Sequence, residues 1–307
     1  MYNSQHWYEY GFARAPGLIR LALEWRVPLE FGAAMLAGPL LSSAAQGDGH
    51  PVLVFPGMLA SDGSTGPLRR YLGRLGYTCH GWGQGNNLGP RDGVLDACRD
   101  TLHEIQRQHR RKVSLIGWSL GGIYARELAK EFPRLVRLVI TLGTPFTGHP
   151  KATNAWRVYE LVTGHRIGAP DLHAPLREPP PLPTTSIYSR SDGVVAWQCC
   201  VERQGRQAEN IEVESSHLGL GLNPLAWYAI ADRLAQPQGR WKPFDRGEVG
   251  VRAKHLVARS GPGRDPGRVR GSGRARREAP RHRRHAPPPP DPPQAGWYLA
   301  PGFLPAA

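Results

Sequence analysis

Short apolar segments alternate with amphipathic ones over residues 50–235, and this alternation sets the expected architecture. Continuous or alternating apolar runs predict strands at 51–55, 77–80, 113–118, 135–142, 184–188 and 211–213. Apolar residues at helical spacing predict helices at 66–75, 94–111, 121–132, around 155–162 and at 224–235. Strands and helices in this order predict an α/β fold with a mostly parallel sheet of about six strands, flanked by helices.

Segments on either side of this alternation, and one within it, have a different composition. Residues 1–49 are expected to form a helical segment packed on the core. The apolar stretch 31–45 also permits a signal-peptide interpretation, but Glu30 and the long segment before it weigh against export, so we expect a cytoplasmic location with export left open. The main domain is expected to span 50–245, with 146–183, rich in Pro, His and Arg, as an insertion.

The formal net charge of +14 suggests a nucleic-acid partner until its distribution is considered. Residues 246–307 hold 13 Lys and Arg against 4 Asp and Glu, together with 11 prolines. This segment has too little apolar surface to offset its ordering entropy, so we expect it to be disordered. The charge therefore predicts no specific nucleic-acid partner, although a binding role for the tail stays a remote alternative. A frame-shifted or fusion-derived origin of the tail also stays open.

The sequence gives little support for a membrane protein, a metal-binding protein or a cofactor-dependent protein. No uninterrupted apolar run approaches the roughly 18 residues needed to span a bilayer. Four cysteines without zinc-ligand or CxxC spacing predict reduced packing residues: Cys79, Cys98, Cys199 and Cys200. The glycines at 81–87 lack the helix and acidic residue of a dinucleotide site, so this loop is expected to border the site mouth. We therefore expect neither a cofactor nor a metal.

A G-x-S-x-G motif at 117–121 carries the main chemical signal. The apolar strand 113–118 runs into it and an amphipathic helix leaves from it, which is the setting that a nucleophilic serine on a sharp turn requires. Gly117 and Gly121 lack Cβ atoms, so strand and helix can approach each other around the serine. Ser119 is therefore the expected nucleophile.

A serine nucleophile needs a base and an acid that orients the base. Asp192 follows the strand 184–188 and is the best-placed acid, although an ordinary Asp-Gly turn would also explain it. Other acidic candidates remain open, namely Glu160, Asp171 and Glu178. His217 follows the last strand and precedes a glycine-rich loop, whereas the histidines after it lie in the tail, so His217 is the expected base. Backbone N–H groups of Met58 and Leu120 are the expected oxyanion donors.

The segment from about 51 to 244 resembles a bacterial α/β-hydrolase of the esterase/lipase kind. The resemblance rests on PVLVFPGM (51–58), GWSLGG (117–122), LGTP (142–145), SRSDGVV (189–195) and SSHLGLG (215–221). It implies Ser119, Asp192 and His217 as the triad and 146–183 as a small cap or lid. PGM replaces the HGGG loop of hormone-sensitive lipases, and related chains generally end near residue 244.

These observations together predict a serine hydrolase that cleaves short- to medium-chain carboxylic esters through an acyl-enzyme. The substrate is expected to be a small molecule. A thioesterase or acyltransferase that uses the same triad is the alternative. Trp118, Trp156 and Trp197 either line an acyl pocket or simply pack in the core. Neither the natural substrate nor the oligomeric state follows from the sequence.

Overall fold

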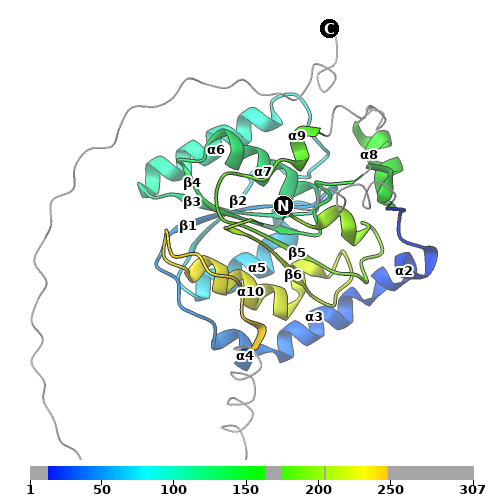
Figure 1. Ribbon diagram of the computed structural model, residues 1–307, viewed down its shortest axis with the longest axis horizontal. Coiled ribbons are helices and arrows are strands. Elements are labelled where there is room, and N and C mark those ends of the chain that lie inside the picture. The colour runs from blue at the N-terminus through cyan, green and yellow to red at the C-terminus, as the bar shows by residue number, and fades with distance from the viewer. Residues whose placement is uncertain (1–12, 149, 164–173, 204, 248–307) are drawn as a thin grey trace, which may run out of the picture.

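The computed structural model describes residues 13–148, 150–163, 174–203 and 205–247 (Figure 1). Its centre is one six-stranded sheet in the order β2-β1-β3-β4-β5-β6, and every neighbouring pair of strands is parallel. The strands are β1 (Pro51–Phe55), β2 (Thr78–Gly81), β3 (Val113–Trp118), β4 (Val136–Leu142), β5 (Thr184–Tyr188) and β6 (Ala208–Glu212). The predicted parallel sheet of about six strands is confirmed.

Helices cover both faces of this sheet (Figure 1). On one face lie α5 (Asp62–Arg74) and α10 (Pro224–Ala235), and on the other lie α6 (Val94–His109) and α7 (Leu120–Glu131). Strand β1 is buried throughout because alternate side chains enter the two cores: Val52 and Val54 enter one, and Leu53 and Phe55 enter the other. A central strand of this sheet is covered by helices on both faces, so its sequence is a continuous apolar run without polar alternation.

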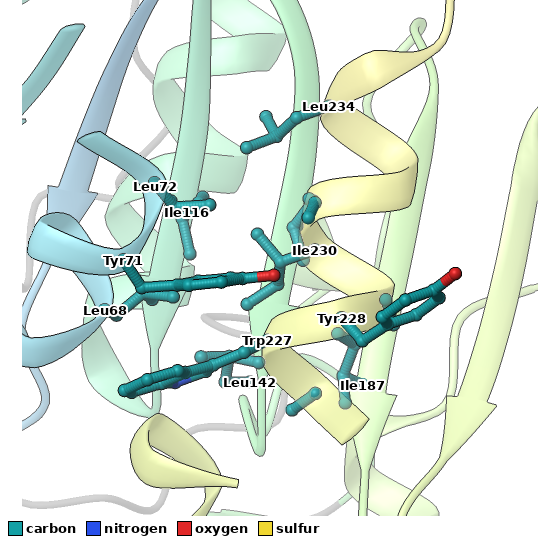
Figure 2. Close-up of a cluster of buried hydrophobic side chains, with 14 of the residues drawn as sticks. Leu68, Tyr71, Leu72, Ile116, Leu142, Ile187, Trp227, Tyr228, Ile230 and Leu234 are labelled. Atoms are coloured by element: carbon teal, nitrogen blue, oxygen red, sulfur yellow. The ribbon is translucent and has the colours of Figure 1, made fainter. Parts of the chain in front are cut away.

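The core on the α5 and α10 face is built around aromatic packing. Tyr71 of α5 stacks on Trp227 of α10 with ring centroids 5.3 Å apart (Figure 2). Ile116 of β3 and Ile187 of β5 meet these two helices from the sheet. Burial of a large apolar side chain contributes about 1.5–3 kcal/mol relative to leaving it exposed, so this cluster is a major source of stability.

Two elements differ from the sequence prediction. Strand β6 is Ala208–Glu212 rather than 211–213, because it lies at the sheet edge and only Ile211 of its five residues is buried. Helix α5 begins at Asp62 rather than at Gly66, although glycines and Pro67 occupy its first turns. The Asp62 carboxylate accepts N–H hydrogen bonds from Trp82 at 2.9 Å and Gly83 at 3.0 Å, so a tertiary contact holds this end of the helix.

Before β1 the chain forms a run of short helices, which we call the N-terminal strut. The strut consists of α2 (Leu18–Ala22), η2 (Leu23–Arg26), α3 (Val27–Leu36) and α4 (Gly38–Ser42). Ala34 and Leu41 are buried, whereas the larger apolar side chains mostly face outward: Leu18, Ile19, Trp25, Leu29, Met35 and Leu36. Glu24, in contrast, is only 6% exposed. The strut therefore turns a carboxylate toward the core and apolar groups toward solvent.

The expected insertion at 146–183 contains short helices in its described parts. These are η3 (Pro150–Ala152), α8 (Trp156–Thr163) and α9 (Ala174–Arg177), and α9 lies beside α7 (Figure 1). Residues 164–173, and all of the expected tail except Arg246 and Gly247, lie outside the described residues. Within the described ranges, no helix is both long and apolar enough to cross a membrane.

Candidate active site

The chain makes a strained turn where β3 ends and α7 begins. Ser119 occupies this turn with φ 51° and ψ −121°, a backbone conformation that non-glycine residues rarely adopt. Its N–H donates to the Leu142 carbonyl at 2.8 Å, which fixes the turn against β4. A Cβ on Gly117 would run into the backbone of Gly121 and Gly122, so glycine is required for this close approach of strand and helix.

Three of the predicted site residues meet at the carboxyl edge of the sheet. The Ser119 hydroxyl lies 2.9 Å from His217 Nε2, and His217 Nδ1 lies 2.6 Å from Asp192 Oδ2. They come from the loops after β3, β5 and β6, which end at the same edge because the strands are parallel. Sequence positions 98 and 25 residues apart are thereby joined in one hydrogen-bonded chain.

The Asp192 carboxylate is held by its own loop. Its Oδ1 accepts N–H hydrogen bonds from Val194 at 2.8 Å and Val195 at 2.7 Å, while Oδ2 faces His217. The side chain is buried, with the residue 2% exposed. The Asp-Gly turn and the contact with His217 thus occur together. Asp171, one of the three alternative acids, lies outside the described residues.

His217 is buried, and neighbouring carboxylates change the pKa of its imidazole. Burial alone would lower the pKa of its imidazole, but the charge and hydrogen bond of Asp192, followed by the charge of Glu24, outweigh burial and raise that pKa. With Nδ1–H donating to the carboxylate, Nε2 is left to accept a proton from the Ser119 hydroxyl. This arrangement can activate the serine and stabilise the imidazolium that results.

The two expected oxyanion donors are Leu120, directly after Ser119, and Met58, in the loop after β1. Leu120 is the first residue of α7, where N–H groups have no acceptor within the helix. Met58 follows Gly57, and a Cβ on Gly57 would lie 3.4 Å from the Ser119 Cβ, so the β1 loop passes directly beside the serine. Among the described residues, no acceptor is present for the N–H of Met58 or of Leu120. Neither amide is therefore occupied within the described part of the chain.

Asn87 supports this loop, a role that the sequence analysis did not assign. Its side-chain Nδ2 donates to the Pro56 carbonyl at 2.9 Å, and its backbone carbonyl accepts the Leu59 N–H at 2.7 Å. Leu59 has φ 63°, so the loop is held in a conformation that needs support. The loop at 81–87 contacts the site through this asparagine, and a polar residue within a glycine-rich stretch was the only signal in the sequence.

Trp118 and the N-terminal strut both form hydrogen bonds with the backbone of His217. Trp118 Nε1 donates to the His217 carbonyl at 3.1 Å, so its role here includes positioning the loop that carries His217. Glu24 accepts the His217 N–H at 2.9 Å. No spacing rule connects positions 24 and 217, and the sequence analysis did not find this contact.

A second Ser-His-Asp arrangement lies at the opposite end of the sheet. His50 contacts Asp48 through Nδ1 and the Ser114 hydroxyl through Nε2 at 2.8 Å. Ser114 is fully buried, and it lies within strand β3 rather than on a turn between a strand and a helix. Burial, despite the opposing effect of Asp48, lowers the pKa of His50 to about 4. This group is therefore structural, and the three residue types alone do not make a reactive serine.

Neither the cysteines nor a cluster of metal-binding side chains offers another reactive group among the described residues. All four cysteines are free, and burial raises the pKa of Cys98 to about 11 and that of Cys199 to about 12, which leaves their thiols protonated and unreactive near neutral pH. In the part of the chain that the structure describes, no three His, Cys, Asp or Glu side chains gather as metal ligands would.

Comparison with known proteins gives partial matches. No family model matches the chain. Serine hydrolase BPHL of Homo sapiens is 35% identical over 108 residues, which cover 32% of this chain and 36% of that protein. The Mus musculus protein of the same name is 32% identical over 104 residues, 31% of this chain and 35% of that protein. The chain thus matches about a third of the length of these curated relatives.

The fold has counterparts among solved structures. Aspergillus fumigatus lipase B has a TM-score of 0.52 to this chain at 19% identity, covering 69% of this chain and 58% of that one. At this identity the likeness concerns the fold. Together with the parallel sheet and the strained serine turn between β3 and α7, this likeness shows that the chain has an α/β-hydrolase fold.

Proposed function

We propose that this protein is a serine hydrolase that cleaves carboxylic esters with short- to medium-length acyl chains. The observation that carries the proposal is the hydrogen-bonded chain from Ser119 through His217 to Asp192, with the serine on a strained turn. The names of the partly matching relatives, a serine hydrolase and a lipase, agree with it. The smallish insertion between β4 and β5 favours small dispersed esters over emulsified substrates.

The proposed reaction has two steps. His217 Nε2 takes the Ser119 proton as the serine oxygen attacks the ester carbonyl, and the Met58 and Leu120 amides hold the oxyanion. The alcohol leaves with the proton that His217 returns, and an acyl-serine remains. Water then attacks this acyl-enzyme by the same route. Asp192 keeps the His217 tautomer and stabilises its cation.

A fluorophosphonate probe tests the nucleophile directly. Wild-type protein is expected to be labelled at Ser119, and Ser119→Ala is expected to remain unlabelled, because the probe reacts with an activated serine. Ser114→Ala serves as the matched control and should be labelled like wild type. Labelling that persists in Ser119→Ala contradicts the assignment.

A panel of p-nitrophenyl esters of increasing acyl length tests the substrate class. We expect the highest kcat/KM on short to medium chains. Thioester substrates and competing alcohols in the same assay separate hydrolysis of esters from thioester hydrolysis and from acyl transfer. A labelled serine without ester cleavage would favour one of these two alternatives.

A further inference from the structure

The N-terminal strut places one carboxylate on both loops that carry the proposed base and acid. Glu24 Oε1 accepts the N–H of His217 at 2.9 Å and that of Gly193, the neighbour of Asp192, at 2.7 Å. Glu24 Oε2 accepts the N–H of Leu218 at 3.0 Å. A single buried side chain therefore bridges the loop after β5 and the loop after β6, and three N–H donors compensate its burial.

A second contact of the same kind lies six residues further along the strut, in α3. Glu30 accepts both the N–H and the hydroxyl of Ser216, each at 2.6 Å. Arg26 donates to Glu30 at 3.1 Å and to the Ser191 hydroxyl at 2.7 Å. Charged side chains of the strut thus contact the residues directly before His217 and directly before Asp192.

Two glycines show how closely the strut approaches these loops. A Cβ on Gly193 would run into the backbone of Arg20 and Leu21, and a Cβ on Gly219 would run into the Glu30 carboxylate. Neither glycine has the positive φ that would by itself require the residue. Their small size is instead explained by the strut lying against both loops.

We propose that Glu24 is a positioning residue for the His217–Asp192 pair, holding the two loops in register and placing a fixed negative charge beside the base. The proposal rests on the proposed function and adds a group from outside the 51–244 segment to it. An imidazolium forms on His217 as Ser119 loses its proton. The negative charge of Glu24 stabilises this cation, whereas a neutral side chain would not. Glu24 thus acts through His217 and not on the substrate.

The charged groups that face His217 are few in the described part of the chain. Asp192 contacts the ring, and Glu24 contacts the backbone N–H of the same residue. Arg26 and Glu30 pair with each other beside the loops. Glu214, on the loop that carries His217, lies 4.0 Å from Arg26, and its side chain is 81% exposed. Both carboxylates nearest His217 raise the pKa of its imidazole. Removal of the Glu24 charge should therefore lower that pKa.

The test is the pH profile of Glu24→Gln. His217 must be neutral to accept the serine proton, so kcat/KM falls on the acid side as the imidazole becomes protonated. We expect Glu24→Gln to move this acid limb to lower pH, because the imidazole loses one of the two negative charges that raise its pKa. We also expect kcat to fall by about 10- to 100-fold with KM within about twofold, because the loops lose register. Glu214→Gln, which removes an exposed charge from the same loop, should leave the acid limb and kcat as in wild type.

Three outcomes distinguish a failure of the Glu24 proposal from a failure of the proposed serine-hydrolase function. If wild-type protein is not labelled by the fluorophosphonate, the proposed function itself fails. If wild type is labelled and active but Glu24→Gln keeps the wild-type acid limb and kcat, Glu24 has no positioning role. If Glu24→Gln does not fold, Glu24→Asp keeps the charge but is one methylene shorter. Its kcat should fall while the acid limb stays in place, and a wild-type kcat in Glu24→Asp would overturn the proposal.

Discussion

At the scale of single residues, the described part of the chain contains two Ser-His-Asp arrangements that differ in their surroundings. Ser119 sits on a strained turn at the start of α7, whereas Ser114 lies fully buried inside strand β3. The hydrogen bonds to histidine are similar, at 2.9 Å and 2.8 Å. Reactivity is therefore expected to follow the backbone around the serine rather than the residue types.

Substitution of the two aspartates makes this comparison measurable. Asp192→Asn is expected to lower kcat on a p-nitrophenyl ester by about 10⁴-fold, because His217 loses the partner that sets its tautomer. Asp48→Asn alters the equivalent contact at His50 and should keep kcat within a few-fold. Circular dichroism should show that both variants are folded. Equal losses in the two variants would remove the distinction.

The sequence was sufficient to select Ser119, His217 and Asp192 as candidates because each follows a strand with a readable apolar pattern. Glu24 was beyond that reasoning. Its carboxylate meets backbone N–H groups 169 to 194 residues away, and a hydrogen bond to a backbone amide leaves no trace in the identity of the residue that donates it. The role of Asn87 was missed for the same reason, because Asn87 forms hydrogen bonds with the backbone of Pro56 and Leu59.

At the scale of elements, one buried ion pair joins helix α7 to the chain between β5 and β6. Arg126 of α7 pairs with Glu202, and each side chain is 1% exposed. Arg126 also donates to the Glu178 carbonyl at 3.1 Å and lies 3.8 Å from the centroid of the Phe146 ring. The helix that begins after Ser119 is thus fixed to the insertion and to the β5–β6 connection.

Removal of one partner should destabilise the fold strongly. Arg126→Met is expected to lower the free energy of unfolding by about 3–5 kcal/mol, because Glu202 is left buried without its cation. The exposed pair of Arg107 and Glu104 is the control, and Arg107→Met should cost about 1 kcal/mol or less. Urea denaturation followed by circular dichroism measures both. If Arg126→Met lowers the free energy of unfolding by less than about 1 kcal/mol, the buried pair does not stabilise the packing of α7 as proposed.

The pattern of elements was largely readable, and its errors have physical causes. Central strands such as β1 and β3 are buried on both faces, so their apolar runs carry a strong signal. Strand β6 at the edge has the polar sequence AENIE, and its start was missed. In the strut, apolar residues face solvent and Glu24 faces the core, which reverses the rule on which amphipathic patterns are interpreted.

At the scale of the whole molecule, both ends of the sheet carry buried histidines with opposite pKa shifts. At the carboxyl edge the neighbouring carboxylates raise the pKa of His217 despite its burial. At the opposite edge burial lowers the pKa of His50 to about 4 from an ordinary value of 6.5. The first shift concerns the pH at which the base is available, and the second concerns the pH at which the fold survives.

The His50 shift predicts how stability responds to acid. Above pH 6.5 His50 is neutral in both the folded and the unfolded chain, so its contribution is fully present. Between pH 6.5 and 4 the unfolded chain takes up a proton that the folded chain refuses, and the free energy of unfolding falls by up to about 3 kcal/mol. The low pKa of Asp48, which burial opposes and the contacts with His50 and Arg137 produce, adds a further loss at lower pH.

Urea denaturation at several pH values, compared between wild type and His50→Gln, isolates this contribution. Glutamine does not titrate, so its curve should decline less steeply between pH 6.5 and 4, even if its stability at pH 7 is lower. The titration of His217 is common to both proteins and cancels in the difference. Parallel curves over this range would show that His50 takes up its proton in the folded state as readily as in the unfolded chain. In that case the buried Asp48–His50–Ser114 group would not be a source of acid sensitivity.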